Sequence, residues 1–368
     1  MKVEAAVARS PEAGFSLEVL DLGEPGDDEI LVRIVAVGVC HTDLVAKNQS
    51  LPFPLPAVLG HEGAGIVERV GSRVTKVVPG DHVVLTFASC GKCLNCQRGS
   101  PGRCREFMIR NFSGQCCPLH AHDGERVSGG FFGQSSFASH SLTNERNVVK
   151  VSKAVPLETL APLGCGIQTG AGTVLNSLRP HAGSSIAIFG AGAVGLSAML
   201  AAIVAGCTRI IVADVKPERL ELAKRLGATD VINSAQENPV ERVRLLTDGE
   251  GADYAVECSG IPSVMRQAID AIAVHGACAL VGAAPAGATV NVDIGSLVAG
   301  RTIMGVIEGD SIPDIFIPQL IELWQQGRFP FDQLLEFYDF GDINNAVEDS
   351  ERGKVVKPVL RFSRAGDG

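Results

Sequence analysis

A glycine-punctuated turn after an apolar strand is the feature that most constrains the fold of this chain. Residues 185–189 are Ser-Ile-Ala-Ile-Phe, and Gly190, Gly192 and Gly195 follow in the pattern G-x-G-x-x-G before an alanine-rich stretch. In such a unit the first glycine permits a tight turn, the second lets a ligand approach the backbone, and the third lets helix pack on strand. The context predicts a strand–turn–helix unit that binds a dinucleotide pyrophosphate at the helix N-terminus.

A carboxylate at the end of the next predicted strand bears on which dinucleotide is bound. Asp214 ends the segment 209–214, nineteen residues after Gly195. It can accept hydrogen bonds from ribose hydroxyls and would repel a 2′-phosphate, which predicts NAD rather than NADP. The alternative is a helix packed closely on a strand, with Asp214 serving only as a cap.

The run 182–208 around this motif contains no charged residue and is long enough to span a bilayer. Glycine at positions 183, 190, 192, 195 and 206 interrupts it. We therefore favour the strand–turn–helix interpretation over a membrane span.

The rest of the chain has two different rhythms. With 368 residues we expect about two domains. The first third has short segments rich in valine and isoleucine (29–37, 65–70, 82–87), which predict a β-barrel or sandwich. From residue 184 onward, apolar strands alternate with helical stretches, which predicts a doubly wound parallel sheet. We also expect a helix that begins at Pro318 and ends at Gly327, and a last strand over 355–362.

Composition excludes several classes of function. The hydrophobic share of 46% and charged share of 20% exclude a disordered chain. The net charge of −9, without a basic run, argues against nucleic acid or an anionic membrane as partner. The N-terminus shows no secretory signal, so we expect a cytoplasmic protein.

Four cysteines lie close together in the sequence. Their spacing, Cys90-x2-Cys93-x2-Cys96-x7-Cys104, can supply four thiolates to one tetrahedral ion, and a closed four-sulfur site is structural. The rival is an iron–sulfur cluster, whose bacterial spacing is C-x2-C-x2-C-x3-C-P. The seven-residue gap and the absence of proline after Cys104 disfavour that rival.

A second group of metal-ligating side chains is dispersed along the sequence. Cys40, His61, Glu62 and Cys165 are the candidates. Their spacing alone establishes nothing, because a lone cysteine is more often a small buried hydrophobe and a lone histidine a hydrogen-bonded turn residue.

With these motifs in place, nearly the whole chain resembles the zinc-dependent medium-chain alcohol dehydrogenases. The motifs that carry the resemblance are the four-cysteine segment and the segments 60–65 (Gly-His-Glu-Gly-Ala-Gly), 165–170 (Cys-Gly-Ile-Gln-Thr-Gly) and 189–195 (Phe-Gly-Ala-Gly-Ala-Val-Gly). The resemblance implies an α/β fold with a β-rich part. A GroES-like β-barrel catalytic domain would comprise residues 1–166 and 308–368, with a structural zinc lobe at about 90–104. A Rossmann NAD-binding domain would comprise residues 167–307, with the active site in the cleft.

The resemblance also implies roles for residues near the metal. It assigns Cys40, His61 and Cys165 to a catalytic zinc with an open fourth position, which makes two zinc ions per chain. Thr42 resembles the hydroxyl that takes the alcohol proton, and Asp43 the carboxylate that orients His61. Glu62 resembles the acid that approaches zinc.

Further residues match coenzyme-binding positions of the family. Besides the glycines and Asp214, the resemblance places on the coenzyme the residues His41, Thr169, Arg219, Val281 and Lys357.

One position departs from many family members. Val45 stands five residues after Cys40, where those members have a histidine that relays protons to solvent. Valine there is typical of the aryl-alcohol (benzyl alcohol) branch. The resemblance then predicts that Leu51, Phe87 and Ile109 line an apolar pocket for an aromatic or allylic alcohol.

The sequence thus predicts a zinc-dependent oxidoreductase that transfers a hydride from a primary aromatic alcohol to NAD. The alternatives are a geraniol-type dehydrogenase, a glutathione-dependent formaldehyde dehydrogenase, and a non-catalytic nucleotide-binding protein on the same fold. Because segment 105–133 resembles the insertion of dimeric members, we expect a homo-oligomer, with a dimer favoured over a tetramer.

Overall fold

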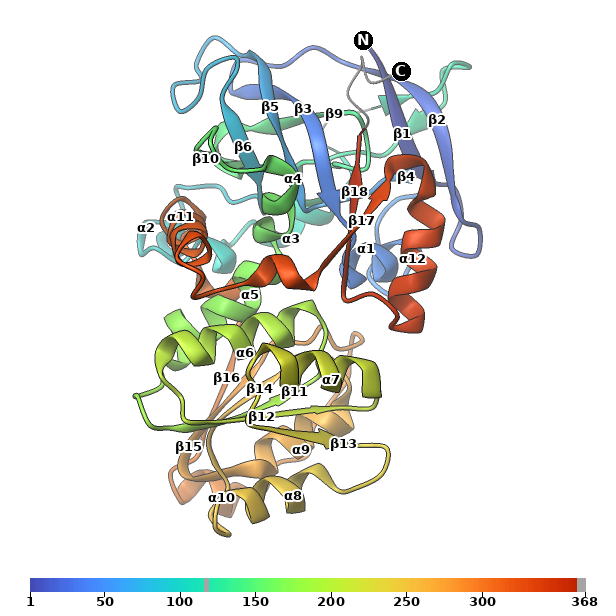
Figure 1. The fold of residues 1–368 in the computed structure, drawn as a ribbon. Coiled ribbons are helices and arrows are strands. Elements are labelled where there is room, and N and C mark those ends of the chain that lie inside the picture. The colour runs from blue at the N-terminus through green and yellow to red at the C-terminus, as the bar shows by residue number, and fades with distance from the viewer. Residues whose placement is uncertain (116–118, 363–368) are drawn as a thin grey trace. The chain divides into compact units, whose positions relative to one another are not determined.

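The computed structural model describes residues 1–115 and 119–362 (Figure 1). Cys116 and Cys117, to which the sequence assigned no role, lie outside these residues. The chain divides into two compact units. The first unit contains the described residues of Met1–Cys165, Ile312–Ile321 and Leu335–Gly368, and the second contains Gly166–Ser311 and Glu322–Leu334.

The first unit is built on two sheets. The smaller is antiparallel, in the order β4-β1-β2-β7-β8. Its strands are β1 (Lys2–Ala8), β2 (Phe15–Leu22), β4 (Ala57–Val58), β7 (Leu119–His120) and β8 (Arg126–Val127). The larger has the order β10-β6-β5-β3-β18-β17, with β9 also paired to β3. Its strands are β3 (Glu29–Gly38), β5 (Gly63–Val70), β6 (His82–Leu85), β9 (His140–Asn144), β10 (Val148–Val151), β17 (Leu335–Asp339) and β18 (Lys357–Arg361).

Strand β3 is the centre of the larger sheet and is buried along most of its length. It pairs antiparallel with β5, β9 and β18. Four of its β-branched residues, Ile30, Val32, Ile34 and Val37, are fully buried or nearly so, as expected for a strand with packing on both faces. The helices of this unit are α1 (His41–Lys47), α2 (Leu94–Gln97), α3 (Phe107–Phe112), α4 (Leu157–Leu160) and α12 (Ile343–Arg352).

The second unit contains a parallel sheet of six strands in the order β13-β12-β11-β14-β15-β16. These strands are β11 (Ser185–Phe189), β12 (Arg209–Asp214), β13 (Asp230–Asn233), β14 (Ala252–Glu257), β15 (Ile272–Leu280) and β16 (Thr302–Gly305). The order reverses beside β11, which is the topological switch point where doubly wound folds bind ligands. The predicted parallel sheet is confirmed.

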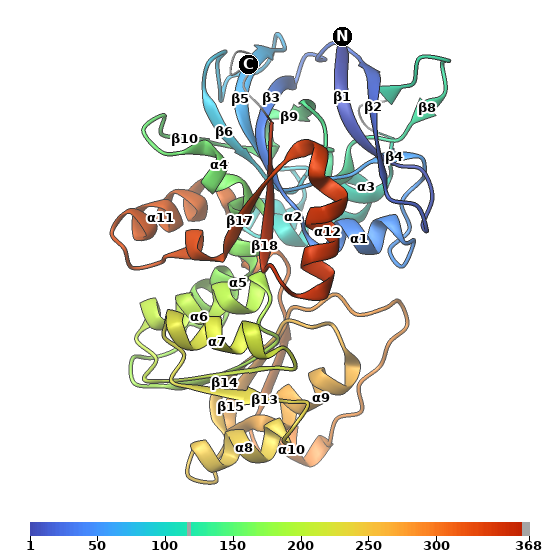
Figure 2. The same cartoon turned by 45° about the vertical axis from the view of Figure 1, so that its right-hand side comes forward.

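Helices cover both faces of this sheet. Helices α6 and α7 lie on one face, and α8 and α9 on the other (Figures 1 and 2). The helices of the unit are α5 (Gly166–Gly172), α6 (Ala193–Ala205), α7 (Pro217–Leu226), α8 (Pro239–Leu246), α9 (Pro262–Ala271) and α10 (Ile294–Val298). Proline in the first turn of α7, α8 and α9 fits there because its missing N–H has no intrahelical partner at that position.

The uncharged run forms β11 and α6, as the glycine pattern predicted. In the parts of the chain that are described, no helix is long and apolar enough to cross a membrane.

Two of the three glycines in the turn have a local constraint that requires glycine. Gly190 has φ +99°, a backbone conformation that favours glycine. A Cβ at Gly195 would overlap the carbonyl oxygen of Gly190, so only glycine lets α6 lie this close to β11. A Cβ at Gly192 would meet no atom within 4 Å, so the backbone there faces open space.

The prediction for the helix near residue 318 was wrong at its start. Helix α11 runs from Pro313 to Gln325, and Pro318 lies inside it. Its buried side chains, Phe316, Ile317, Leu320 and Ile321, lie on both sides of Pro318 in the sequence. The helix continues through the proline because this apolar stripe is buried, and packing outweighs the loss of one backbone hydrogen bond.

The glycine turn provides a test of the packing between α6 and β11. We expect Gly195→Ala to lower the free energy of unfolding by about 1–3 kcal/mol, because the added methyl forces helix and strand apart. The matched variant Gly192→Ala places the same methyl group in open space, and we expect it to change the free energy of unfolding by less than about 0.5 kcal/mol. Denaturant unfolding of both variants measures the difference, and equal losses would contradict the packing argument.

Candidate active site

A buried carboxylate organises the segment between α1 and β5. Asp43, in the first turn of α1, is fully buried and accepts three hydrogen bonds. Its Oδ2 accepts from the backbone N–H of Cys40 at 2.9 Å, and its Oδ1 from that of Gly60 at 3.1 Å. Oδ1 also lies 2.8 Å from Nδ1 of His61, which donates to it. The carboxylate thereby fixes the backbone at Cys40 and the ring orientation of His61.

Four side chains that the sequence left dispersed meet beside this carboxylate. One ligand atom from each of Cys40, His61, Glu62 and Cys165 lies within 4.8 Å of the others. They come from the residue before α1, the segment before β5 and the residue after the short turn at 161–164. Two thiols and an imidazole at such separations can hold a tetrahedral zinc ion with one position left open.

The state of His61 suits a metal ligand. Nδ1 faces the carboxylate of Asp43, so Nε2 is the ring nitrogen that remains for a metal ion. Nε2 is buried and has no hydrogen-bond partner among the residues described. A buried, unpaired nitrogen costs free energy, and a metal ion between it and the two thiols would remove that cost.

The electrostatics around Cys40 favour its thiolate. A hydrogen bond from Cys165 is the main reason that the pKa of Cys40 lies well below the usual range. Burial acts in the opposite direction, and Lys357 and His61 contribute positive charge nearby. The thiolate is the form that binds metal.

Glu62 is part of a buried ion pair that the sequence did not predict. Both carboxylate oxygens accept hydrogen bonds from Nζ of Lys357 at 2.9 Å. Nζ also donates to the carbonyl of Val39 at 3.0 Å. Burial is the largest single influence on the pKa of Lys357 and would lower it, but the charges of Glu62, Cys40 and Cys165 and the hydrogen bonds to Glu62 together outweigh burial, so the pKa lies above its usual value.

These contacts bear on the expected role of Lys357 at the coenzyme. The three donors of the ammonium are directed to Glu62 and Val39, so a phosphate would have to compete with a carboxylate for them. The structure therefore places Lys357 as the counter-ion of Glu62, and its contact with a pyrophosphate stays a prediction.

Helix α1 carries three more of the predicted positions. Thr42 is half-buried, and its Oγ1 lies 3.7 Å from Sγ of Cys40. His41 is exposed at the start of the helix, and Val45 is half-buried one turn further on. A hydroxyl thus lies next to the metal-binding cluster, while the side chain at position 45 can neither take nor give a proton.

The predicted substrate residues have different surroundings. Phe87 is buried in the core of the first unit and contacts Phe107 at 5.9 Å between ring centroids. Leu51 is half-buried, whereas Ile109 on α3 is 61% exposed. The place of Ile109 in a substrate pocket stays a prediction.

Sequence reasoning missed the surroundings of the His61 ring. Phe132 stacks on the imidazole at 4.4 Å with an interplanar angle of 21°, and Phe131 meets it edge-on at 5.4 Å. The amide of Gln134 donates to the carbonyl of His61 at 2.9 Å. The signal was Gly-Gly-Phe-Phe-Gly at 129–133, because glycines around a bulky pair indicate a tight turn.

The four-cysteine segment forms the second cluster. Its thiols lie within 4.8 Å of one another, with Sγ–Sγ distances of 3.5 Å from Cys93 to Cys96 and 4.0 Å from Cys90 to Cys96. Four sulfurs at 2.3 Å from a tetrahedral ion lie about 3.8 Å apart, whereas a disulfide needs about 2.05 Å. Hydrogen bonds from backbone amides, chiefly that of Arg105, lower the pKa of Cys93 to about 6. The donor set fits a closed zinc site.

In the second unit, Asp214 has backbone contacts that the capping interpretation foresaw. Its Oδ2 accepts from the N–H of Ala191 at 2.6 Å and its Oδ1 from that of Lys216 at 2.8 Å. Each carboxylate oxygen has a second lone pair for a ribose hydroxyl. Nε of Arg219 is buried with no hydrogen-bond partner among the described residues. These groups, with the open backbone at Gly192, fit an adenosine diphosphate moiety.

Two other predicted coenzyme residues lie in the same unit. Thr169 on α5 is half-buried and donates through Oγ1 to Glu308 at 3.4 Å. Val281 follows β15 directly, and its N–H donates to the carbonyl of Glu257 at 2.9 Å. Both stay predictions as coenzyme contacts.

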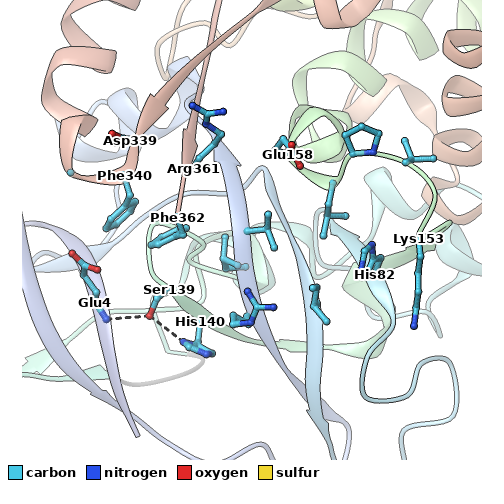
Figure 3. A pocket seen from close by; sticks show the side chains of 18 of the residues that line it. Glu4, His82, Ser139, His140, Lys153, Glu158, Asp339, Phe340, Arg361 and Phe362 are labelled. Atoms are coloured by element: carbon cyan, nitrogen blue, oxygen red, sulfur yellow. Dashed lines mark hydrogen bonds between the residues drawn. The ribbon is translucent and has the colours of Figure 1, made fainter. Parts of the chain in front are cut away.

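A cavity of about 970 Å³ lies elsewhere in the first unit (Figure 3). Its lining contains three carboxylates, three Lys or Arg side chains and two histidines, which are Glu4, Glu158, Asp339, Arg33, Lys153, Arg361, His82 and His140. None of the predicted site residues lines it. The converging donor atoms, and not this cavity, therefore locate the candidate active site.

Known proteins match this chain over both units. The alcohol dehydrogenase GroES-like domain matches residues 26–153, and the zinc-binding dehydrogenase domain matches residues 193–326. A zinc-binding alcohol dehydrogenase domain protein from Burkholderia ambifaria is 51% identical and aligns over 99% of this chain and all of its own with a TM-score of 0.96.

Two relatives are named for the alcohol that they oxidise. Benzyl alcohol dehydrogenase from Acinetobacter calcoaceticus is 49% identical over 99% of this chain and all of its own, with a TM-score of 0.94. Geraniol dehydrogenase from Castellaniella defragrans (strain DSM 12143 / CCUG 39792 / 65Phen) is 42% identical over 98% of each chain. These similarities over the whole chain show that it belongs to the zinc-dependent medium-chain alcohol dehydrogenases.

Proposed function

We propose that this alcohol dehydrogenase oxidises primary aromatic alcohols with NAD, in the reaction RCH2OH + NAD⁺ ⇌ RCHO + NADH + H⁺. The observation that carries the proposal is the convergence of Cys40, His61 and Cys165, with the Nε2 atom of His61 unpaired among them. The 49% identity to a benzyl alcohol dehydrogenase supports the aromatic substrate.

The residues of the first unit would hold a catalytic zinc and the proton. Zinc bound by Cys40, His61 and Cys165 supplies a Lewis acid that lowers the pKa of an alcohol hydroxyl. Asp43 accepts the hydrogen bond from Nδ1 and thereby holds the ring so that Nε2 is directed at the metal position. Thr42, whose hydroxyl lies beside Cys40, would accept the proton from the alcohol.

The proton has no side-chain route along α1. Val45 stands where a histidine would continue the chain of donors and acceptors, and it is apolar and half-buried. We infer that the proton passes from Thr42 to water or to the coenzyme ribose, and that Val45 instead adds apolar surface near the substrate.

The residues of the second unit would hold NAD. The oxidised nicotinamide supplies the acceptor for the hydride. The backbone at Gly192 and the N-terminus of α6 would take the pyrophosphate, since helix N-termini bind anions. Asp214 would accept hydrogen bonds from the adenosine ribose, and Arg219 would lie beside it.

A second candidate is an allylic terpene alcohol dehydrogenase. It is favoured by the 42% identity to a geraniol dehydrogenase over nearly the full length of both chains. Geraniol and benzyl alcohol share a CH2OH group attached to an sp² carbon, so the same apolar pocket could take either.

The state of assembly and the cellular compartment remain predictions. A homo-oligomer, with a dimer favoured, is supported by apolar side chains near the edge strand β16. Ile294 and Val298 of α10 are 68% and 82% exposed, and contact with a second copy would cover them. Thiol ligands in two clusters suit a reducing cytoplasm.

Metal analysis of the purified protein tests the two proposed zinc sites. We expect two zinc ions per chain, and one in Cys165→Ala, with kcat/KM lowered about a hundredfold or more because a metal ligand is lost. The control is Cys207→Ala, a half-buried cysteine outside both clusters, which should keep both ions and its activity. Two ions and full activity in Cys165→Ala would contradict the catalytic site.

Coenzyme preference tests the role of Asp214. We expect the wild type to prefer NAD⁺, and Asp214→Asn to lower the ratio of kcat/KM for NAD⁺ to that for NADP⁺ by about tenfold or more. Removing the charge ends its repulsion of the 2′-phosphate, while asparagine keeps one acceptor oxygen. A wild type that prefers NADP⁺ would refute this assignment.

A substrate panel decides between the candidate activities. We expect kcat/KM to be higher for benzyl alcohol than for geraniol, and at least about tenfold higher than for ethanol, because the ring gains apolar burial. A higher value for geraniol would replace the aromatic proposal by the terpene one. Preference for S-hydroxymethylglutathione, or no turnover of any alcohol by protein with two zinc ions, would overturn both.

A further inference from the structure

We propose that Phe132 is a positioning residue that holds the imidazole of His61 in place for its metal ion. We further propose that helix α3 transmits the closure of the four-cysteine cluster to Phe132, so that metal binding at the two clusters is coupled. The inference rests on the proposed function, because it takes Cys40, His61 and Cys165 as a metal site.

The first step is the geometry of the His61 ring. The hydrogen bond from Nδ1 to Asp43 fixes one point on the ring edge but leaves the ring able to tilt about that point. Phe132 lies against one face of the ring at 4.4 Å, inclined by 21°, and removes that freedom. Phe131 closes in edge-on at 84°. The direction in which Nε2 points toward a metal ion therefore depends on Phe131 and Phe132 as well as on Asp43.

The second step is the backbone that presents Phe132. Phe132 has φ +51°, a conformation that bulky residues rarely adopt. Gly130 and Gly133 on either side also have positive φ. Gln134 holds the turn to the metal-binding segment, since it donates to the carbonyl of His61 and accepts from the N–H of Gly63. The turn is thus shaped to put this ring on the imidazole.

The third step is the contact between Phe132 and α3. Two rings of α3 pack edge-on against Phe132, Phe112 at 5.0 Å and Phe107 at 6.4 Å between centroids. Phe112 also packs on Phe131 at 5.8 Å. Helix α3 therefore supports both rings that contact His61.

The fourth step is the attachment of α3 to the four-cysteine cluster. The backbone N–H of Phe107 donates to the carbonyl of Cys104, and the N–H of Glu106 donates to its Sγ. Within α3, the buried Asn111 exchanges two hydrogen bonds with the backbone of Ala88, two residues before Cys90. The helix is thus anchored at both ends of the cysteine segment.

These contacts form a continuous path from Cys104 through α3 and Phe132 to His61. An ion in the four-cysteine cluster would fix Cys104 and hence the start of α3. Binding there should raise the metal affinity of the catalytic cluster, and the effect should be reciprocal. Changes in groups that orient a metal ligand typically alter metal affinity by about 10–100-fold.

The experiment measures metal affinity directly. In protein with zinc in the four-cysteine cluster, Co²⁺ is titrated into the catalytic cluster against a competing chelator and followed by its visible absorption. We expect Phe132→Leu to raise the Kd for Co²⁺ about tenfold or more and to change the absorption bands, because leucine fills similar space without stacking. The matched control is Phe340→Leu. Phe340 stacks on Phe362 at 4.1 Å beside the cavity of Figure 3, and its loss should leave the Kd within about twofold of wild type.

A second pair of variants tests the coupling. Phe112→Leu keeps all four cysteines and should also raise the Kd for Co²⁺. Cys96→Ser removes one ligand of the four-cysteine cluster and, introduced alone, should raise the Kd for Co²⁺. Combined with Phe132→Leu it should raise the Kd little further, because Phe132→Leu already interrupts the path to His61. If Cys96→Ser does not fold, Phe112→Leu still decides the role of α3.

The outcomes separate this inference from the proposed function. Failure of the wild type to bind Co²⁺ through Cys40, His61 and Cys165 would refute the proposed function. If the wild type binds Co²⁺ and Phe132→Leu has the same Kd and spectrum, only the inference is refuted. If Phe132→Leu changes the KM for the alcohol and nothing else, Phe132 contacts the substrate and the inference is likewise refuted. Equal weakening in Phe340→Leu would show general destabilisation and also overturn it.

Discussion

One buried carboxylate, that of Asp43, holds the metal-binding segments together by accepting three hydrogen bonds. Asp43 binds the backbone of Cys40 and Gly60 and the ring of His61, and it is fully buried while doing so. Burying a carboxylate without hydrogen-bond partners costs folding free energy. Asp43 can therefore be buried only because three donors surround it. Because of it, two segments distant in sequence present a thiol and an imidazole nitrogen to the same point.

Two other buried groups complete this environment. Glu62 and Lys357 neutralise each other beside the thiols, so that a carboxylate lies near the donor cluster without an unpaired charge in the interior. The aromatic pair at 131–132 covers the imidazole and keeps its surroundings apolar. In a low-dielectric environment of this kind, the interactions of an ion with its ligands are stronger than they would be in water.

The sequence was most informative where short-range rules apply. Strand β12 has the bounds expected for it, and the glycine turn has the predicted form because Gly190 and Gly195 each meet a local constraint. The four cysteines could be grouped from spacing alone, since they lie within one segment. Helix α11 was misplaced because burial of its apolar stripe outweighs the helix-breaking tendency of Pro318. Cys40, His61 and Cys165 needed the family resemblance, and the stacking of Phe132 and the Glu62–Lys357 pair could not be foreseen, because periodicity does not show which distant side chains meet.

We expect Cys40, His61 and Cys165 to bind one metal ion together. Diffraction data collected on either side of the zinc absorption edge, from crystals grown with zinc, test it most directly. We expect an anomalous peak at about 2.0–2.3 Å from both Sγ atoms and from Nε2 of His61, and a second peak among the four clustered cysteines. A map with a peak only at the four cysteines, and His61 turned away from Cys40 and Cys165, would contradict it.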